Sequence, residues 1–442
     1  MSKRKPIVFE GDALEVIRLV EDTFDNLFVT GNAGTGKSTL IRHIISTTRK
    51  PMLVVAPTGI AAVNIGGNTI HSALGIPIGM YLMFGAKRDY DFDVFVDADL
   101  RAKSGKLSRA KKAAAKKADL LIIDEVSMLR SDLLDAVSEM LKMLRNSKRP
   151  FGGMQVLLVG DMMQLPPVVC DYEWGAFRET YDSEFFFDAK CMSDIQIKKV
   201  ELIKVHRQSD PDFIRILNNL RVMNLEQSDI EDLNQRVKDG NYTTDDGVYI
   251  TTHNYKADQI NDSMTAKIDA KPYVHVAAID GYFNLNSVLA LERLVLKKGM
   301  RVMTLINDQS GDFFNGKIGT VVGEPYGLVK VEFDDGITTS IPTHTWESIS
   351  MEYDAVTGKM RRTVQGTFTQ YPLKPAYAIT VHKSQGLSFD KAILDINEVF
   401  AAGQAYTAVS RLRTLGGLTL MSRISRDVQI GMNDRLLAFI RG

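Results

Sequence analysis

Apolar runs and helical periodicities alternate along the chain, which predicts an α/β protein built on parallel sheets. The runs at 27–29, 52–56, 120–123 and 156–159 are apolar at every position. Strands buried on both faces of a parallel sheet have this pattern. Residues 132–145 instead place apolar side chains three and four positions apart, which predicts a core-facing helix. These elements define a first α/β segment at about 1–190.

A second α/β segment follows from about 191 to the end of the chain, and its middle part changes character. Between 297 and 371, glycines separate short β-branched runs, and Asn315-Gly316 and Asp335-Gly336 are hairpin signals. This pattern predicts a small inserted β-barrel, which we expect to be of SH3 type. The flanking elements predicted for this segment are strands at 247–251, 377–381 and 391–396 and a helix at 256–267.

The first segment contains an unusual stretch between its early strands and the run at 120–123. Residues 101–117 carry eight basic side chains and no acidic one. Two interpretations stay open, a solvated alanine-rich helix or a small insertion that contacts phosphates. Five aromatic residues precede or border this stretch, and they could stack on a base pair or pack inside the protein. They are Tyr81, Phe84, Tyr90, Phe92 and Phe95, and the eight basic residues are Arg101, Lys103, Lys106, Arg109, Lys111, Lys112, Lys116 and Lys117.

Composition limits the number of domains and the kinds of partner and site that this chain can have. With 442 residues, of which 45% are hydrophobic, the chain can form two to four compact domains. Lysine plus arginine equals aspartate plus glutamate at 54 each, so net charge indicates no polyanionic partner. The two cysteines, Cys170 and Cys191, exclude a disulfide scaffold and lack the spacing of a zinc or iron–sulfur site. Without a secretory signal or a membrane-length apolar run, we expect a soluble, cytoplasmic protein that does not bind membranes.

Residues 31–38 read Gly-Asn-Ala-Gly-Thr-Gly-Lys-Ser, directly after an apolar strand and before a helix. This is the phosphate loop, whose glycines let backbone N–H groups form an anion nest at the start of a helix. Lys37 is predicted to contact the β- and γ-phosphates, and the Ser38 hydroxyl to bind Mg²⁺. The predicted nucleotide-binding residues are Gly31, Ala33, Gly34, Thr35, Gly36, Lys37, Ser38 and Thr39.

Two acids end the apolar run at 120–123. In a parallel sheet, side chains at the carboxyl ends of strands face the ligand crevice. Asp124 is therefore predicted to join Ser38 in holding Mg²⁺, and Glu125 to orient or deprotonate the attacking water. Together with the phosphate loop, these acids indicate nucleotide hydrolysis.

Further motifs follow along the chain, and their order indicates which process the nucleotide hydrolysis drives. Taken together, they resemble the Pif-type DNA helicases of superfamily one, over about 25–425. The segment Pro150-Phe151-Gly152-Gly153-Met154-Gln155 resembles that family's signature, rather than more distant RecD-like relatives. The motifs are Ala56-Pro57-Thr58-Gly59, Thr69-Ile70-His71-Ser72, Gly160-Asp161-Met162-Met163-Gln164, Val205-His206-Arg207-Gln208, Val381-His382-Lys383-Ser384-Gln385-Gly386 and Ala408-Val409-Ser410-Arg411.

The resemblance implies two RecA-like domains, at 1–190 and 191–442, that bind ATP in a cleft between them. It implies a small wedge insertion at about 80–107 and an SH3-like barrel at about 297–371. Gln164 matches the family's γ-phosphate sensor, and Arg207 and Arg411 match arginines that act on the transferring phosphate. The positions that match the family's single-strand track are Pro57, Thr58, His71, His382 and Lys383.

The implied function is an ATP-dependent DNA helicase that moves 5′ to 3′ on single strands. The implied cofactors are ATP and Mg²⁺, and the implied partners are single-stranded DNA and single-strand/duplex junctions, bound as a monomer. Residues 9–15 lack the family's adenine-reading glutamine, so ATP over other nucleotides is an expectation. The chain also lacks the long N-terminal extension of eukaryotic members, which favours a bacterial or phage origin.

Two alternative functions stay open. The first is a translocase or remodelling ATPase that does not separate strands. The second is a nucleotide-gated binding module with slow turnover. The presence of Glu125, Gln164, Arg207 and Arg411 argues against the binding module.

Overall fold

The structure is a computed structural model, and its contacts divide the chain into two compact units. The N-terminal unit comprises Val8–Lys204 with Ser348–Gln365 and Met432–Gly442. The C-terminal unit comprises Val205–Glu347 and Gly366–Gly431 with Met1–Ile7. The structure describes residues 9–82, 92–208, 210–238, 240, 243–308, 312–354, 359–394, 403–424 and 434–441.

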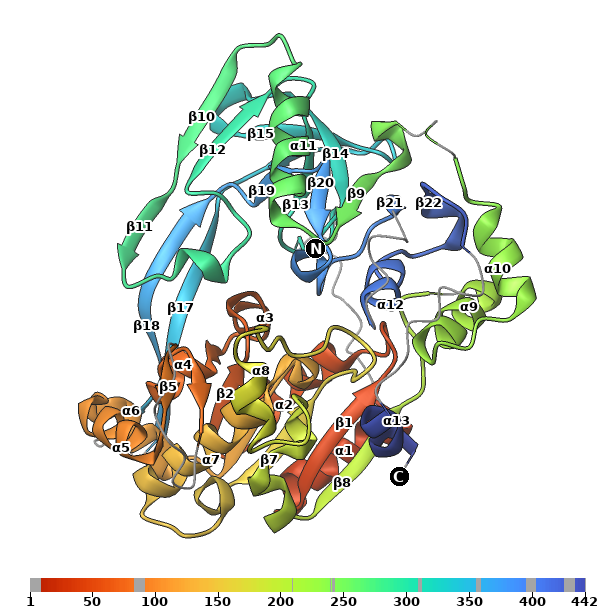
Figure 1. The fold of residues 1–442 in the computed structure, drawn as a ribbon. Helices are drawn as coiled ribbons and strands as arrows, with labels where there is room; N and C mark the ends of the chain where they lie inside the picture. Colours follow the sequence, from red (N-terminus) through yellow and green to blue (C-terminus); the bar gives the residue numbers. More distant parts are fainter. Residues whose placement is uncertain are drawn as a thin grey trace. The chain divides into compact units, whose positions relative to one another are not determined.

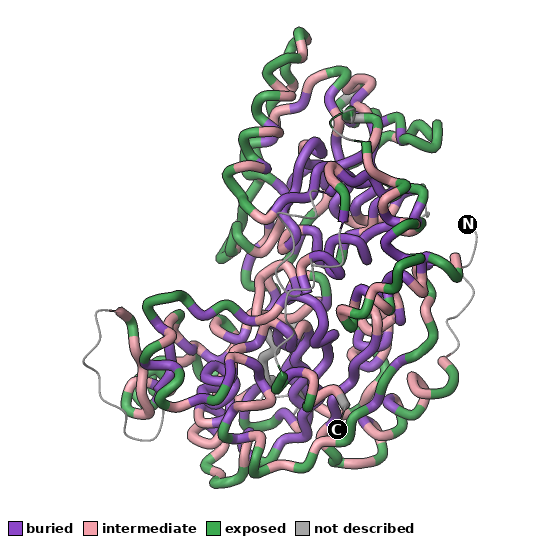
Figure 2. The backbone as a smooth tube through the Cα atoms, turned by 45° about the vertical axis from the view of Figure 1, so that its right-hand side comes forward, coloured by how far each residue is buried: buried purple, intermediate pink, exposed green. Residues whose placement is uncertain are grey.

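The N-terminal unit is built on a six-stranded parallel sheet in the order β3-β2-β6-β7-β1-β8 (Figure 1). Every residue of β2, β6 and β7 is buried, which explains their continuous apolar sequence. Figure 2 shows buried residues gathered in the interior and exposed residues toward the outside. The four strands predicted for this segment are thereby confirmed. The strands are β1 (Asn26–Gly31), β2 (Met52–Ala56), β3 (Asn68–Thr69), β6 (Leu120–Ile123), β7 (Gln155–Val159) and β8 (Ile197–Leu202).

Strand β8 lies beyond the domain boundary predicted at 190, and the compact unit runs on to Lys204. The strand pairs in parallel with β1 at the edge of the sheet. Only Val200 and Leu202 of its six residues are buried. An edge strand that is exposed on one side has too few apolar positions to be recognised as a buried run.

Helices cover both faces of this sheet. One face carries α1, α2 and α3, whose apolar residues join those of the strands in one core. On the other face the Phe28 ring of β1 packs edge-on against Phe186 and next to Phe439 of α13. The helix predicted at 132–145 is confirmed as α7. The helices are α1 (Gly11–Asp22), α2 (Lys37–Thr47), α3 (Gly59–Ile65), α4 (Ile70–Leu74), α5 (Asp97–Lys106), α6 (Arg109–Lys117), α7 (Ser131–Arg145), α8 (Trp174–Arg178) and α13 (Asp434–Arg441).

The segment between β3 and β6 contains α4, the short strands β4 (Met80–Tyr81) and β5 (Val94–Phe95), and the helices α5 and α6. Tyr81 is buried, its ring lies 5.9 Å from that of Phe95, and its hydroxyl donates to the Pro77 carbonyl. Tyr81 therefore packs inside the protein. Two other aromatic residues of this stretch, Phe84 and Tyr90, lie outside the described residues.

The C-terminal unit contains a parallel four-stranded sheet in the order β20-β9-β21-β22. The strands predicted at 247–251 and 377–381 and the helix predicted at 256–267 are confirmed within three residues. Of the strand predicted at 391–396, residues 395 and 396 lie outside the described residues. The elements are β9 (Val248–Thr251), β20 (Ala378–Thr380), β21 (Ala392–Leu394), β22 (Leu418–Leu420), α9 (Pro211–Arg221), α10 (Gln227–Asn234), α11 (Asn254–Ala266) and α12 (Gln404–Val409).

A β-rich insertion interrupts this unit, as the sequence predicts. Its five-stranded antiparallel sheet has the order β16-β15-β14-β13-β19. Gly336, with a φ of 81°, lies in the short turn between β15 and β16, which confirms the hairpin signal at Asp335-Gly336. Gly316, with a φ of 97°, lies just before β14 at the end of a long connection from β13, so Asn315-Gly316 is not a tight hairpin turn. The SH3 type stays a prediction. The strands are β13 (Arg301–Thr304), β14 (Ile318–Gly323), β15 (Val329–Phe333), β16 (Thr338–Ile341) and β19 (Leu373–Pro375).

The insertion begins earlier than the predicted residue 297. Leu294 and Leu296 of β12 belong to the same core as Val321 and Val331. Strand β12 pairs with β10, whose five residues are all exposed or half-buried, so β10 does not read as a buried strand. The remaining strands are β10 (Pro272–Val276), β11 (Ala278–Gly281), β12 (Arg293–Lys297), β17 (His344–Asp354) and β18 (Lys359–Gln370).

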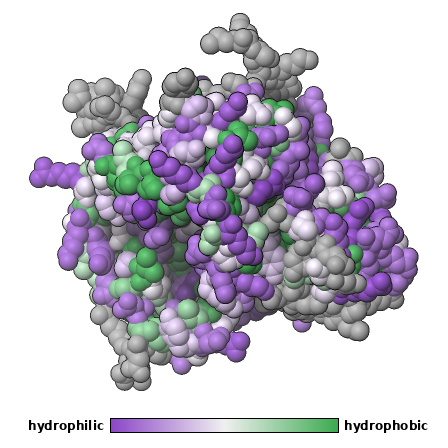
Figure 3. Space-filling model, turned by 90° about the horizontal axis from the view of Figure 1, so that it is seen from above, coloured by the Kyte–Doolittle hydropathy of each residue, from purple (hydrophilic) through white to green (hydrophobic). Residues whose placement is uncertain are grey.

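Hydrophilic residues dominate the face seen in Figure 3, with smaller hydrophobic patches between them. Among the described residues, every helix is too short or too polar to cross a membrane.

Candidate active site

The phosphate loop joins the end of β1 to the start of α2, and its shape depends on glycine. Gly34 and Gly36 have φ of 86° and 90°, in the left-handed region that favours glycine. At Gly31, a Cβ atom would lie 2.6 Å from the Leu202 carbonyl oxygen and 2.8 Å from Thr35 Oγ1. A side chain at any of these three positions would strain or displace the loop.

Polar contacts inside the loop hold its lysine. The Lys37 ammonium donates to the carbonyl oxygens of Gly31 at 2.7 Å and Asn32 at 3.1 Å. Thr35 Oγ1 also donates to the Asn32 carbonyl, at 2.9 Å. Ala33 is buried, Ser38 is exposed, and Thr39 lies one residue further along α2. The ammonium is thus held at the loop, where a bound phosphate would compete for it.

The two acids follow β6 directly. Asp124 is buried, and its Oδ1 accepts from the Glu125 amide at 2.9 Å. Burial and the neighbouring charge of Glu125 raise the pKa of the Asp124 carboxyl to about 7, against the opposing effects of Lys37 and Arg42. Glu125 has a left-handed backbone, with φ of 53°. A non-glycine residue in this conformation is characteristic of functional turns.

Gln164 follows β7 and is fixed by Asp161. Gln164 Nε2 donates to Asp161 Oδ2 at 3.2 Å, and the Met163 amide donates to Asp161 Oδ1 at 3.2 Å. Asp161 is 1% exposed. Sequence reasoning missed its role, although an acid directly after Gly160 at a strand end could have indicated it.

These motifs meet at one edge of the sheet. Strand β7 lies between β6 and β1, so the carboxyl ends of the three strands are neighbours. At Gly160, a Cβ atom would lie 3.0 Å from the Val126 amide, so the end of β7 closely approaches the turn after Glu125. The structure therefore brings the phosphate loop, the acid pair and Gln164 together, as predicted.

The residues at this edge fit a magnesium ion bound together with a nucleotide. The Ser38 hydroxyl and the Asp124 carboxylate are hard oxygen donors. Because Asp124 is buried, a bound cation would stabilise its charged form. Among the described residues, no group of three or more His, Cys, Asp or Glu side chains is arranged to hold a metal ion. Mg²⁺ needs no such cluster, because substrate phosphates and water supply its other ligands.

The predicted track residues of the N-terminal unit follow β2 and β3 at the same sheet edge. Thr58, next to Pro57, caps α3 by accepting from the Ala61 amide at 3.3 Å. His71 Nδ1 lies 3.1 Å from the carbonyl oxygens of both Ile76 and Pro77. Because carbonyls only accept, this nitrogen carries the proton, and Nε2 is the acceptor in the neutral ring.

In the C-terminal unit, the two predicted arginines meet at Ser410. Arg207 Nη1 donates to the Ser410 carbonyl at 3.2 Å, and Arg411 Nη2 donates to Ser410 Oγ at 3.0 Å. Arg411 is 3% exposed, and its Nε donates to the Thr407 carbonyl at 2.9 Å. Gln208, which sequence reasoning missed, adds hydrogen bonds from Nε2 to the carbonyls of Ser410 and Leu412.

His382 and Lys383 form a turn directly after β20. Burial lowers the pKa of the His382 imidazole. Beside this turn, burial and the charge of Lys383 lower the pKa of the Lys374 ammonium to about 8. Sequence reasoning missed Lys374, although a lysine between apolar residues and prolines in 372–375 is an available signal.

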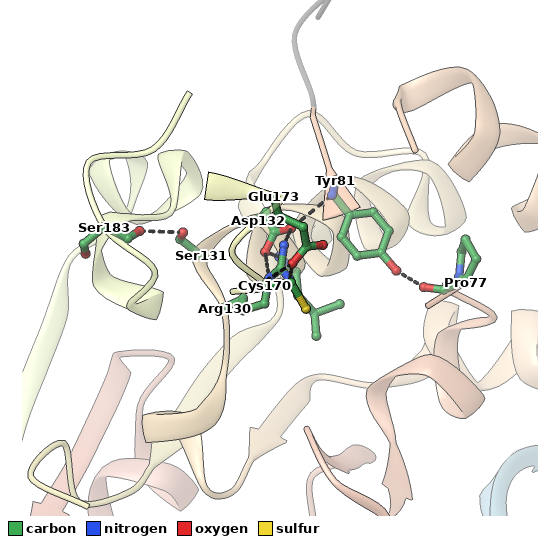
Figure 4. A network of polar contacts seen from close by, with 9 residues as sticks. Pro77, Tyr81, Arg130, Ser131, Asp132, Cys170, Glu173 and Ser183 are labelled. Carbon is green, nitrogen blue, oxygen red and sulfur yellow. Dashed lines mark hydrogen bonds and ion pairs between the residues drawn. The ribbon is translucent and has the colours of Figure 1, made fainter. Parts of the chain in front are cut away.

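In the N-terminal unit, a buried polar network links three segments that follow the site motifs in the sequence (Figure 4). Arg130 binds both Asp132 and Glu173. Asp132 Oδ2 accepts from the Tyr81 amide at 3.0 Å, and Glu173 Oε2 accepts from the Cys170 amide at 2.9 Å. The network therefore joins the segment after His71, the start of α7 and the segment after Gln164.

A parallel sheet with a phosphate loop after β1, acids after β6 and a polar side chain after β7 defines a P-loop nucleotide hydrolase. Residues 12–245 match the sequence model of the PIF1-like helicases. The ATP-dependent DNA helicase Pif1 of Bdellovibrio bacteriovorus is 32% identical over 429 residues, which cover 95% of this chain and 88% of that relative. The chain spans 62% and 61% of the rat and mouse relatives named ATP-dependent DNA helicase PIF1.

Solved structures agree with this assignment. Bacteroides sp Pif1 in complex with ADP-AlF4 superposes with a TM-score of 0.88 at 34% identity, covering 98% of this chain and 97% of that one. Bacteroides Pif1 bound to ssDNA gives a TM-score of 0.67 at 33% identity, with the same coverage. The chain therefore belongs to the PIF1-like helicases, a family of ATP-dependent DNA helicases.

Proposed function

We propose that this protein uses ATP hydrolysis to move 5′ to 3′ along single-stranded DNA and to separate duplex strands at junctions. The observation that carries the proposal is the meeting of the phosphate loop, Asp124–Glu125 and Gln164 at one sheet edge. Bound single-stranded DNA in the Bacteroides relative supports the substrate. The polarity rests on the family resemblance.

The residues at the sheet edge and the two arginines of the C-terminal unit have distinct roles in hydrolysis. The loop amides and Lys37 bind the β- and γ-phosphates, because the ammonium is already held at the loop. Glu125 orients the attacking water and accepts its proton. Gln164, which Asp161 positions, senses the γ-phosphate. Arg207 and Arg411 neutralise charge that develops on the transferring phosphate.

Ser38 and Asp124 would hold Mg²⁺, which when bound neutralises phosphate charge and orients the nucleotide. Pro57, Thr58, His71, His382 and Lys383 would contact the single strand through its backbone. Such contacts carry no sequence information, which suits a motor that must pass any base. We also propose that the protein works as a monomer in the cytoplasm.

A strand-displacement assay on duplexes with a 5′ or a 3′ tail tests the proposal. We expect ATP-dependent displacement only with the 5′ tail, and none by the Glu125→Gln control. Displacement from the 3′ tail alone would overturn the polarity. DNA-stimulated hydrolysis without displacement of either substrate would favour a translocase, and slow hydrolysis that DNA leaves unchanged would favour the binding module.

A further inference from the structure

A basic surface covers the exposed side of α5 and α6, in a chain whose total charges balance. Residues 101–117 contain eight basic side chains and no acidic one. The acids Asp97 and Asp99 stand in the first turn of α5, where they favour the positive end of the helix. Six of the basic residues are exposed and define what we call the α5–α6 basic surface: Arg101, Lys103, Lys106, Arg109, Lys116 and Lys117.

The opposite sides of both helices are packed, which fixes the direction of the basic surface. Leu100, Ala114 and Ala115 are buried, and both helices contact α7 (Figure 1). Arg145 of α7 donates from Nη1 to three carbonyls at the end of α6, those of Ala115, Lys116 and Ala118, at 2.8, 3.0 and 2.6 Å. The C-terminal end of α6 is therefore firmly held.

Two contacts also join these helices to α4, which carries His71. Lys111 Nζ donates to the Ser72 carbonyl at 2.7 Å. At Gly75, a Cβ atom would lie 2.7 Å from Cδ2 of Leu107, the residue that ends α5. The α5–α6 basic surface and the proposed track residue His71 thus belong to one packed assembly within the N-terminal unit.

We infer that the α5–α6 basic surface binds the phosphate backbone of duplex DNA next to the single strand. This inference rests on the proposed function. Proteins that hold single strands interleave basic and aromatic side chains, on which bases stack. Residues 97–117 contain no aromatic residue, so this surface can contact phosphates but offers no aromatic ring on which bases could stack.

The dimensions and charge of the surface also suit a duplex. Helices of ten and nine residues are about 15 Å and about 13 Å long at about 1.5 Å per residue. Duplex DNA carries one negative charge per about 1.7 Å of its axis, so several phosphates fall within reach of six cations. Lysine and arginine on an alanine-rich scaffold read no bases, which matches a motor that must open any sequence.

The test compares binding to a 5′-tailed duplex with binding to the tail alone. The variant replaces Lys103, Lys106, Arg109 and Lys116 by glutamine and leaves Lys111, which bonds Ser72, in place. A matched control replaces four other exposed basic residues of the same unit by glutamine: Arg18, Lys148, Arg149 and Lys190. Both variants change the net charge equally, and circular dichroism and thermal unfolding confirm their folding.

We expect the variant to bind the tailed duplex at least about tenfold more weakly, with a salt slope shallower by about 0.9 for each lost phosphate contact. Its affinity for the tail alone, and hydrolysis stimulated by the tail, should match the wild type. The control variant should show the same difference in affinity between the tailed duplex and the tail alone as the wild type does.

Two results would overturn the inference. If the variant binds the tailed duplex and the tail alone with equally reduced affinity, the surface belongs to the single-strand track. If the salt slopes of binding to both DNAs are unchanged, the surface is a solvated helix face. Failure of the proposed function is seen separately, because it would appear in the wild-type protein as absent displacement of the 5′-tailed duplex.

Discussion

Arg130 and Asp132 form a bidentate ion pair at the start of α7, with Nε–Oδ1 and Nη2–Oδ2 distances of 2.9 and 2.8 Å (Figure 4). The Asp132 side chain is fully buried, and the Arg130 side chain is 16% exposed. Arg130 also binds Glu173 at 2.9 Å. Because the network reaches Tyr81 and Cys170, this pair joins the segment after His71 to the segment after Gln164.

We predict that Arg130→Ala lowers the free energy of unfolding by roughly 3–5 kcal/mol, because it leaves a buried carboxylate without its partner. Urea denaturation of the wild type and the variant measures the loss. Lys142→Ala, which removes a partly exposed pair with Glu139 in the same helix, is the control and should cost at most about 1 kcal/mol. Equal losses for both variants would refute the special role of Arg130.

The loss at Arg130→Ala should also grow with pH. Burial raises the pKa of Asp132, and Arg130 opposes that rise. Without the arginine, the folded state holds the Asp132 proton to higher pH than the unfolded state does. Stability therefore falls as pH rises above the ordinary carboxyl pKa of about 3.9, so the loss should be larger near about pH 8 than near about pH 5.

The sequence was most informative where burial or phosphate chemistry imposes a local pattern. Strands β2, β6 and β7 are buried at every residue, and the phosphate loop needs its glycines and Lys37 at fixed spacing. Edge strand β8 was not predicted, because the charged residues on its exposed side interrupt the apolar run. The role of Gln208 could not be predicted, because its partner Leu412 lies 204 positions away in the chain.

The chemistry at the sheet edge predicts two different defects. Lys37→Ala should abolish turnover by removing the ammonium that faces the phosphates, while DNA affinity without nucleotide stays near the wild type. Glu125→Gln should keep nucleotide affinity and lose hydrolysis, because the amide cannot accept the proton of the attacking water. Steady-state hydrolysis with single-stranded DNA and binding of a fluorescent ATP analogue measure both. Near-wild-type hydrolysis by Glu125→Gln would show that another group orients the water.

The arginines of the C-terminal unit should affect the rate more than the affinity for ATP. Arg207→Ala and Arg411→Ala are each expected to lower kcat by about 10³–10⁵, the range found for arginines that act on the transferring phosphate. Arg413→Ala, at a partly exposed neighbour that pairs with Asp390, is the control and should retain the wild-type kcat. A rise in KM with kcat unchanged would instead show ground-state binding.

Arg411→Ala should in addition destabilise the C-terminal unit more than Arg207→Ala does. Arg411 is 3% exposed and holds both Thr407 and Ser410, whereas Arg207 is half-buried. Thermal unfolding of the two variants checks this order, and equal melting temperatures would contradict it.

Lys374 predicts an unusual dependence of stability on pH. Lys374 as a whole residue is 9% exposed, and burial beside Lys383 lowers the pKa of its ammonium to about 8, below the ordinary lysine pKa of about 10.4. Below about pH 8 the charge is buried at a cost on the order of 3 kcal/mol, and the cost fades as pH rises toward about 10.4. Lys374→Met should therefore be more stable than the wild type near neutral pH, and the difference should shrink in alkali. Urea denaturation across this range measures the difference, with the exposed Lys391→Met as control, and a constant difference would show that Lys374 is not buried in its charged form.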